Sequence, residues 1–418
     1  MSKLSKLIAE LCPEGVEWKK LGEVCEIVSK IKWSDTDNDA KYVYVDLSSV
    51  DIKSHQISND YIIDKDTAPS RAQQIIRTDD VLFGTTRPTL MRYCLVPKTL
   101  DGQICSTGYC VIRSKKELVL ARWIYHMISS NGFAAFVNER QQGAGYPSIS
   151  DKVLFSFEIP VPPLPVQEEI VRILDMFTTL EAELEAELDC RKRQYEFYRN
   201  QLLSFEGERS EGVKWMKLGG AIISLKTGLN PRKNFVLNED GSDKPYITGK
   251  DIFNNRINVT EKTDLINDET VRLINKRACL ESGLLLFAST GTGTVGRMAV
   301  IGQYNNDWAM SETLYAIKTK EVLNPKFLMH CLYSECVKSQ FETKISKGSV
   351  PHLKVVDLLN VQVPVPPLSE QHRIVSILDR FEALTTDLQS GLPAEIEARR
   401  KQYEYYREQL LTFKRKSA

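Results

Sequence analysis

Two long segments of the chain carry apolar residues at intervals of three and four positions, with polar residues between them. This spacing is typical of amphipathic helices that bury one narrow stripe. The stripe includes Ile170, Ile173, Phe177, Tyr195, Tyr198 and Leu202 in the first segment, and Ile374, Ile377, Phe381, Tyr403, Tyr406 and Leu410 in the second. Such a narrow stripe suits one partner helix, so the pattern predicts an antiparallel coiled coil. Burial of each helix in a separate domain would give the same pattern.

The two helical segments are expected to differ in continuity. The first spans 40 residues from Val166 to Phe205, which is about 60 Å as one continuous helix. In the second, Gly391 and Pro393 should break or kink the helix. We also expect the stripe tyrosines, including Tyr198 and Tyr406, to be buried.

The helical segments are copies of one another. The run "IPVPPLPVQEEIVRILDMF" at 159–177 recurs as "VPVPPLSEQHRIVSILDRF" at 363–381, a shift of 204 positions. The run "RQYEFYRNQLLSF" from Arg193 returns as "KQYEYYREQLLTF" from Lys401. Because "EGVEWKKLG" near the start also recurs as "EGVKWMKLG", the chain is predicted to be a tandem duplication of a domain plus a connector.

The segments between the helices carry short strand-like runs separated by Asn, Asp, Gly and Pro clusters. Examples are "KYVYVDL" from Lys41, "DVLFGTT" from Asp80 and "LLLFAST" from Leu284. One helix is expected in each segment, around residues 121–130 and 325–334. The predicted fold class is α+β, with two mixed α/β domains that each hold an irregular antiparallel sheet and are separated by the paired helices about a pseudo-twofold axis.

This pattern defines five predicted regions in the 418 residues. They are an N-terminal helix (1–14), a first domain (15–159), a central connector (160–211), a second domain (212–363) and a C-terminal connector (364–418).

Composition narrows the class of protein. No run of eighteen apolar residues appears, which predicts no membrane span. Nine scattered cysteines without a C-x-x-C pair predict reduced thiols in the cytoplasm and no zinc cluster. The 55 basic residues balance the 55 acidic ones, but the second domain holds 20 basic against 15 acidic residues. Nucleic-acid binding would therefore rest on local basic patches.

A variable domain followed by "PVPPL", then Q-x-x-I-V-x-x-L-D, then a "QYEYYR"-like tail, all duplicated, resembles the specificity subunit of type I restriction-modification systems. The resemblance covers the whole chain. It implies two target recognition domains held apart by a coiled coil, each reading one half of a bipartite site on double-stranded DNA. It also implies helices that dock methyltransferase subunits, two in number, and leaves open whether restriction subunits bind.

The same resemblance implies a non-catalytic subunit without a cofactor of its own. S-adenosylmethionine, ATP and Mg²⁺ would belong to the partner subunits. The alternative is a coiled-coil adaptor that binds proteins and does not read DNA.

Candidate DNA-binding residues come from local excesses of basic and amide side chains, because Arg suits guanine and Gln suits adenine in the major groove. In the first domain they are Arg71, Arg77, Arg87, Arg92 and Lys98, with Gln141, Gln142 and Tyr146 in the loop "ERQQGAGYPS". In the second they are Lys226, Arg232, Lys233, Lys250, Arg256 and Arg297, with Lys347 and His352 in the matching loop "SKGSVPH". Each basic residue could instead be paired with an acid on the surface, and some could serve the fold.

Enzyme-like motifs lack their context. The run "GTGTVG" at 291–296 fits G-x-G-x-x-G, but the residues after it suggest strand and turn where a dinucleotide site needs a helix. We interpret it as a glycine-rich turn. His126 and His330 occupy matching positions on the predicted helices, where hydrogen bonding is favoured over metal binding.

Overall fold

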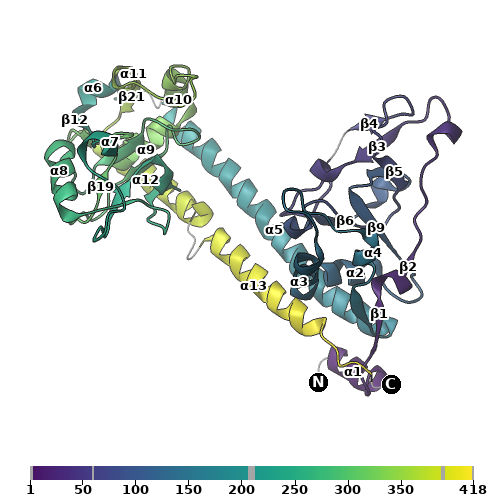
Figure 1. Ribbon diagram of the computed structural model, residues 1–418. Coiled ribbons are helices and arrows are strands. Elements are labelled where there is room, and N and C mark those ends of the chain that lie inside the picture. The colour runs from purple at the N-terminus through teal and green to yellow at the C-terminus, as the bar shows by residue number, and fades with distance from the viewer. Residues whose placement is uncertain (1–2, 59–60, 206–211, 387–390, 417–418) are drawn as a thin grey trace. The chain divides into compact units, whose positions relative to one another are not determined.

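The computed structural model describes residues 3–58, 61–205, 212–386 and 391–416 (Figure 1). Contacts between residues divide the chain into two compact units. Unit 1 comprises residues 1–186 and 395–418, and unit 2 comprises residues 187–394. The division falls inside the longest helix, so each unit contains one of the two predicted recognition domains and parts of both connectors.

Unit 1 contains two four-stranded sheets, in the orders β2-β9-β6-β7 and β4-β3-β8-β5, and a two-stranded ribbon of β1 and β10. Its strands are β1 (Glu17–Lys20), β2 (Cys25–Glu26), β3 (Tyr42–Val45), β4 (Ile62–Ile63), β5 (Ala72–Ile75), β6 (Val81–Gly84), β7 (Tyr93–Leu95), β8 (Ile104–Ser106), β9 (Tyr109–Ser114) and β10 (Glu158–Val161). Its helices are α1 (Lys3–Leu11), α2 (Ala121–Ile128), α3 (Asn131–Arg140), α4 (Asp151–Leu154), the first part of α5 (Leu164–Leu203) and most of α13 (Leu392–Leu410).

Unit 2 repeats this plan with sheets β12-β20-β17-β18 and β16-β13-β19, and the ribbons β11-β21 and β14-β15. Its strands are β11 (Lys214–Lys217), β12 (Ile222–Thr227), β13 (Lys244–Ile247), β14 (Ile252–Phe253), β15 (Arg256–Ile257), β16 (Leu265–Ile266), β17 (Leu285–Ala288), β18 (Met298–Val300), β19 (Ala309–Met310), β20 (Leu314–Thr319) and β21 (Gln362–Val365). Its helices are α6 (Leu218–Ala221), α7 (Pro231–Asn234), α8 (Asp268–Ala278), α9 (Pro325–Tyr333), α10 (Glu335–Glu342), α11 (Val355–Leu359) and α12 (Leu368–Thr386), with the second part of α5.

The sheets differ from the expectation of purely antiparallel pairing. Strand β3 pairs in parallel with β8 in unit 1, and β13 pairs in parallel with β19 in unit 2. About sixty residues separate the two strands in each case. Local apolar patterns cannot encode a pairing between strands so far apart in sequence.

The recognition domains also contain more helices than the one predicted for each. Helices α2 and α9 lie where they were expected, and α3 and α10 follow directly. In α3, the Ser130 side chain caps the helix by accepting a hydrogen bond from the Phe133 amide, while Phe133 and Val137 are buried one turn apart. Short helices of this kind are stabilised mainly by packing against the rest of the domain. Their own sequences therefore show little helical periodicity, and the sequence did not predict them.

The connectors pack against each other within each unit, as the stripe predicts. In unit 1 the ring of Phe177 on α5 stacks on Tyr406 of α13 with centroids 5.4 Å apart, and Arg400 contacts Glu181 at 2.7 Å. Because later residues of α5 meet earlier residues of α13, the pair is antiparallel. In unit 2 the ring of Tyr198 stacks on Phe381 of α12 at 5.3 Å. The second connector consists of two helices, α12 and α13, with the predicted helix breakers Gly391 and Pro393 at the start of α13.

The expectation that every stripe tyrosine is buried was wrong. Tyr198 and Tyr406 are 41% and 45% exposed, although each ring stacks on a phenylalanine of the facing helix. Tyr403 is buried and Tyr195 is half-buried, and both turn toward a recognition domain. The stripe therefore serves two surfaces, the facing helix and the domain that the helix supports.

A matched polar contact joins each recognition domain to its helices. In unit 1, His126 on α2 lies between Tyr403 on α13 (Nδ1 to Oη, 3.0 Å) and Asp175 on α5 (Nε2 to Oδ1, 2.8 Å). Burial lowers the pKa of His126, so the imidazole is neutral at pH 7. Its Nε2–H then donates to the Asp175 carboxylate, and its Nδ1 accepts from the Tyr403 hydroxyl. The interpretation of His126 as a hydrogen-bonding residue is confirmed.

A buried glutamine provides a second matched anchor. The Gln167 side chain accepts from the Leu120 amide and donates to the carbonyl oxygens of Leu118 and Pro162. In unit 2, Gln371 makes the same three contacts with Asn324, Val322 and Pro366. These two glutamines are the Q of the repeated Q-x-x-I-V motif.

Candidate nucleic-acid interface

In unit 1 two loops meet at one end of the sheet β2-β9-β6-β7. The first, residues 85–92, follows β6, and the second, residues 141–148, links α3 to α4; together we call them loop pair 1. The Arg87 amide donates to the Pro147 carbonyl at 2.7 Å, and the Ile149 amide donates to Thr85 at 3.0 Å. The backbone of two distant segments is thereby fixed as one surface.

Three of the predicted residues are exposed on loop pair 1. The Arg87 guanidinium lies 4.9 Å from the centre of the Tyr146 ring, which is an exposed cation–π contact. Gln142 belongs to the same loop, where its backbone pairs with Ser148. Arg87 adopts a left-handed backbone (φ 48°), which is uncommon for arginine and is often found at functional sites. The pair presents a guanidinium, an amide and an aromatic face to solvent.

Unit 2 repeats this backbone frame at loop pair 2, residues 289–297 and 345–352. The Gly291 amide donates to Pro351 at 3.0 Å, and the Leu353 amide donates to Ser289 at 2.8 Å. Both hydrogen bonds lie 204 positions after their counterparts in unit 1. The Thr290 hydroxyl also lies 2.7 Å from His352 Nδ1.

The side chains on the shared frame differ between the units. Gly291 replaces Arg87, and its φ of +126° leaves a Cβ no room beside the Thr294 side chain. His352 stands where unit 1 has Ser148, and Lys347 stands where it has Gly143. One backbone frame thus carries two different sets of donors and acceptors.

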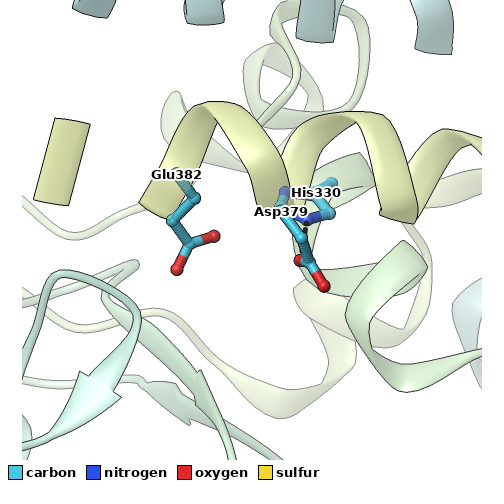
Figure 2. Close-up of side chains that lie close together, drawn as sticks. All are labelled: His330, Asp379 and Glu382. Carbon is cyan, nitrogen blue, oxygen red and sulfur yellow. Dashed lines mark ion pairs between the residues drawn. The ribbon is translucent and has the colours of Figure 1, made fainter. Parts of the chain in front are cut away.

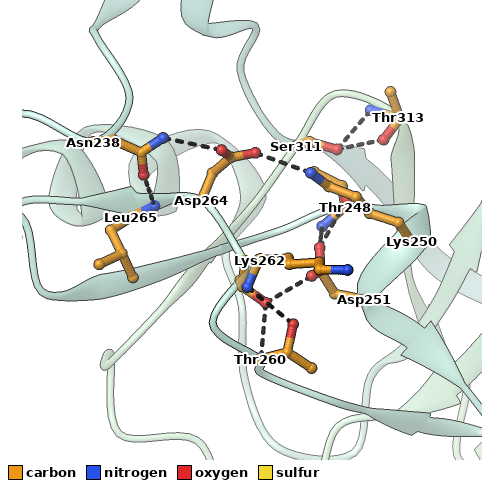
Figure 3. A network of polar contacts seen from close by, with 11 residues as sticks. Asn238, Thr248, Lys250, Asp251, Thr260, Lys262, Asp264, Leu265, Ser311 and Thr313 are labelled. Carbon is orange, nitrogen blue, oxygen red and sulfur yellow. Dashed lines mark hydrogen bonds and ion pairs between the residues drawn. The ribbon is translucent and has the colours of Figure 1, made fainter. Parts of the chain in front are cut away.

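A cleft of about 560 Å³ adjoins loop pair 2. Its lining includes Arg232, Lys250, Thr290 and Glu312. Figure 3 shows that Lys250 is held by Asp264, at 3.2 Å, while Asn238 donates to the same carboxylate. The hydrogen bond from Asn238, with help from Lys250, lowers the pKa of Asp264, so this carboxyl stays charged and offsets the charge of Lys250.

The remaining basic candidates of unit 1 fall into two groups. Arg92 is the last residue of the first loop of loop pair 1 and directly precedes β7. Arg71 reaches the same end of the sheet, since its carbonyl accepts a hydrogen bond from the Thr107 amide, in the turn that contacts Thr85. Arg77 and Lys98 lie at the opposite end of β6 and β7, where Lys98 lines a separate cleft. Gln141 caps the C-terminus of α3 and is half-buried.

In unit 2, Lys226 near the end of β12 and Arg297 before β18 lie at the loop-pair end of the sheet. Arg297 donates to the Ile252 carbonyl at 3.2 Å, so it also supports the β14-β15 hairpin. Arg256 is exposed on that hairpin, and Lys347 is exposed in its loop. The side chain of Lys233 lies outside the described residues.

Two features were not predicted from the sequence. One is Thr290, which contacts His352, and the other is the contact between the two loops of each loop pair. A signal for the contact between the loops was present, because Pro147 and Pro351 are 204 positions apart, as are the loop residues Arg87 and Gly291 that they contact. The interpretation of "GTGTVG" as a turn is confirmed, since β18 and not a helix follows it.

None of the nine cysteines forms a disulfide. Among the described residues, no helix is both long and apolar enough to span a membrane.

Comparison with known proteins agrees with this architecture. The model of the type I restriction modification DNA specificity domain matches residues 13–189 and again 211–398. The chain is 35% identical over 310 residues to the EcoR124I/EcoR124II specificity subunit of Escherichia coli, covering 70% of this chain and 71% of that subunit.

Two solved structures share the fold. One, from work on complex assembly and conformational transition of the type I R-M system, has a TM-score of 0.60 at 25% identity and covers 96% of this chain and 98% of its own. The type I S subunit of M. genitalium has a TM-score of 0.52 at 13% identity, covering 95% and 96%. The two matched specificity domains and the Escherichia coli relative support the specificity-subunit interpretation over the protein-binding adaptor. With two specificity domains on duplicated helical connectors, the chain belongs to the family of type I restriction-modification specificity subunits.

Proposed function

We propose that each unit reads one half of a bipartite sequence on double-stranded DNA through its loop pair. The observation that carries the proposal is the shared backbone frame with different side chains, which is what two readers of different half-sites require. Arg87 can fork onto guanine O6 and N7, and Gln142 can pair with adenine N6 and N7. In unit 2, His352 and Lys347 are the candidate readers on loop pair 2, at the positions of Ser148 and Gly143 in unit 1.

The connectors supply the docking surface for methyltransferase subunits, one for each copy of the repeat. Phe197 on α5 and Tyr405 on α13 are matched aromatic residues, and each is 62% exposed. Exposed aromatic side chains are typical anchors of protein interfaces. Two such sites support a complex with two methyltransferase subunits.

In this proposal the chain itself is non-catalytic and works in the cytoplasm. S-adenosylmethionine, ATP and Mg²⁺ are bound by the methyltransferase and restriction partners. The recognition domains position the complex on the DNA and select the bases. Contacts to phosphates fix the register of a protein on the duplex, while contacts to base edges distinguish one sequence from another.

The test is methylome sequencing of cells that carry the chain with its methyltransferase partner. Arg87→Ala should relax one or two base positions in a single half-site, by about 1–3 kcal/mol of discrimination for each lost bidentate contact. His352→Ala should relax positions in the other half-site only. Arg77→Ala, an exposed arginine at the opposite end of β6, is the matched control and should leave the motif unchanged. If Arg87→Ala alters both half-sites or neither, loop pair 1 is not the reader of one half.

A further inference from the structure

The His–Asp contact of unit 2, between His330 and Asp379, differs from that of unit 1 because the histidine Nε2 has no hydrogen-bond partner among the described residues. His330 on α9 is 0% exposed, and its Nδ1 lies 3.2 Å from the Tyr195 hydroxyl. Its Nε2 lies 3.7 Å from Asp379 Oδ1, too far for a hydrogen bond, and finds no other hydrogen-bond partner among the described residues. In unit 1 the same nitrogen is satisfied at 2.8 Å. A buried nitrogen without a partner needs an explanation.

A third potential ligand lies beside this pair. Glu382 is one helical turn after Asp379 on α12, and Figure 2 shows the three side chains grouped together. One donor atom from each of His330, Asp379 and Glu382 lies within 4.8 Å of the others, and Glu382 Oε2 is buried without a hydrogen-bond partner. The first copy has Thr178 at the position of Glu382.

We propose that His330, Asp379 and Glu382 form a binding site for a divalent cation of the Zn²⁺ class, present in unit 2 and absent from its counterpart in unit 1. One imidazole and two carboxylates form a donor set that Zn²⁺ accepts, whereas Mg²⁺ and Ca²⁺ prefer oxygen ligands alone. Donor atoms that share a tetrahedral zinc lie roughly 3.3 Å apart, given bonds of about 2.0–2.1 Å. The separation of 3.7 Å between His330 and Asp379 is closer to that value than to a hydrogen bond.

The surrounding contacts suit this role and also limit the affinity. With Nδ1–H donating to Tyr195, the lone pair of His330 is left on Nε2, facing the carboxylates, as in metal sites where a second contact orients the imidazole. The Lys326 ammonium binds the other oxygen of Asp379 at 2.7 Å, and the Arg199 guanidinium lies 5.4 Å from the Tyr195 ring centre. Because these cations oppose a metal ion, we expect micromolar binding, with solvent completing the coordination.

The site would brace the recognition domain of unit 2 on its connector. In unit 1 a direct His126–Asp175 hydrogen bond joins α2 to α5, and in unit 2 the ion would join α9 to α12. This inference does not depend on DNA reading, because its readout is metal binding.

The test is Zn²⁺ titration of the metal-free full-length chain by calorimetry, with Co²⁺ as a spectroscopic probe. One Zn²⁺ per chain and a higher Tm in Zn²⁺ are expected, and Mg²⁺ should give neither. Glu382→Thr, which installs the residue of the first copy, should abolish binding while circular dichroism shows an unchanged fold. Thr178→Ser is the matched control and should still bind one ion.

A second variant tests whether the positive charge of Lys326 weakens Zn²⁺ binding. Lys326→Ala frees Asp379 Oδ2 and removes a nearby cation, so Zn²⁺ should bind roughly tenfold more tightly. Since Cys279 and Cys336 are exposed thiols, the Co²⁺ complex must also lack a thiolate charge-transfer band. No binding by the wild-type chain, a thiolate band, or undiminished binding by Glu382→Thr would overturn the proposal.

Discussion

At the residue scale, the repeated Q-x-x-I-V-x-x-L-D motif has a physical explanation. Its glutamine satisfies three backbone groups where the recognition domain meets the start of the connector, as Gln167 does for Leu118, Leu120 and Pro162. Its aspartate forms a hydrogen bond with a histidine of the recognition domain in unit 1, where Asp175 pairs with His126. The motif is therefore a mount for the domain, although its letters alone suggest only a helix.

Replacing Gln167 by Ala should lower the free energy of unfolding of unit 1 by about 2–4 kcal/mol, because buried backbone groups lose their partners. Gln371→Ala should have the same effect on unit 2. Urea or thermal unfolding of the full chain measures both changes. Glu168→Ala, at the exposed neighbouring position, should change stability by less than about 0.5 kcal/mol. Equal effects of the Gln167 and Glu168 substitutions would show that the glutamine contacts contribute little.

At the element scale, each connector helix divides its surface among the partner helix, the recognition domain and solvent. Tyr403 faces the domain and Tyr406 faces the partner helix, while Tyr405 between them is exposed. In α5, Tyr195, Tyr198 and Phe197 repeat this arrangement. The "QYEFYR" and "QYEYYR" runs thus direct three aromatic rings to three different surfaces.

Replacing Phe197 or Tyr405 by Ala should each remove one methyltransferase subunit from the complex, and the double variant should remove both. The free chain should keep its stability within about 0.5 kcal/mol, because both rings are mostly exposed. Native mass spectrometry of the assembled complex gives the stoichiometry. The control is Lys192→Ala, also exposed on α5, which should leave the complex intact. A full complement of methyltransferase in the double variant would place the docking surface elsewhere.

At the scale of the whole molecule, duplication gives two recognition domains with the same internal plan. The borders "EGVEWKKLG" and "EGVKWMKLG" supply equivalent joints before the domains, and "IPVPPL" and "VPVPPL" do so after them. The backbone agrees, since β1 pairs with β10 and β11 pairs with β21 in corresponding registers. The domains should therefore be interchangeable.

Replacing residues 212–363 by a copy of residues 15–159 should convert the target into an interrupted palindrome, because two identical readers on symmetry-related mounts read opposite strands. Methylome sequencing with the methyltransferase partner measures the motif. The reciprocal copy, with the second domain in both places, should give a different palindrome from the other half-site. A stable chimera in complex with its partner that methylates a non-palindromic site would contradict equivalent mounting.

The sequence by itself determined the duplication, the long first helix, the break in the second connector and the family. Repeats are found by comparing one part of the chain with another, and helical periodicity and helix breakers are local features of the sequence. Only the tertiary structure decided the parallel pairs β3-β8 and β13-β19, the exposure of Tyr198 and Tyr406, and which basic candidates share a surface. Arg87 and Arg77 look alike in sequence, yet they lie at opposite ends of β6. His126 and His330 match in sequence, yet only His126 has both ring nitrogens hydrogen-bonded. Such differences depend on contacts between residues far apart in sequence, and no local pattern specifies those contacts.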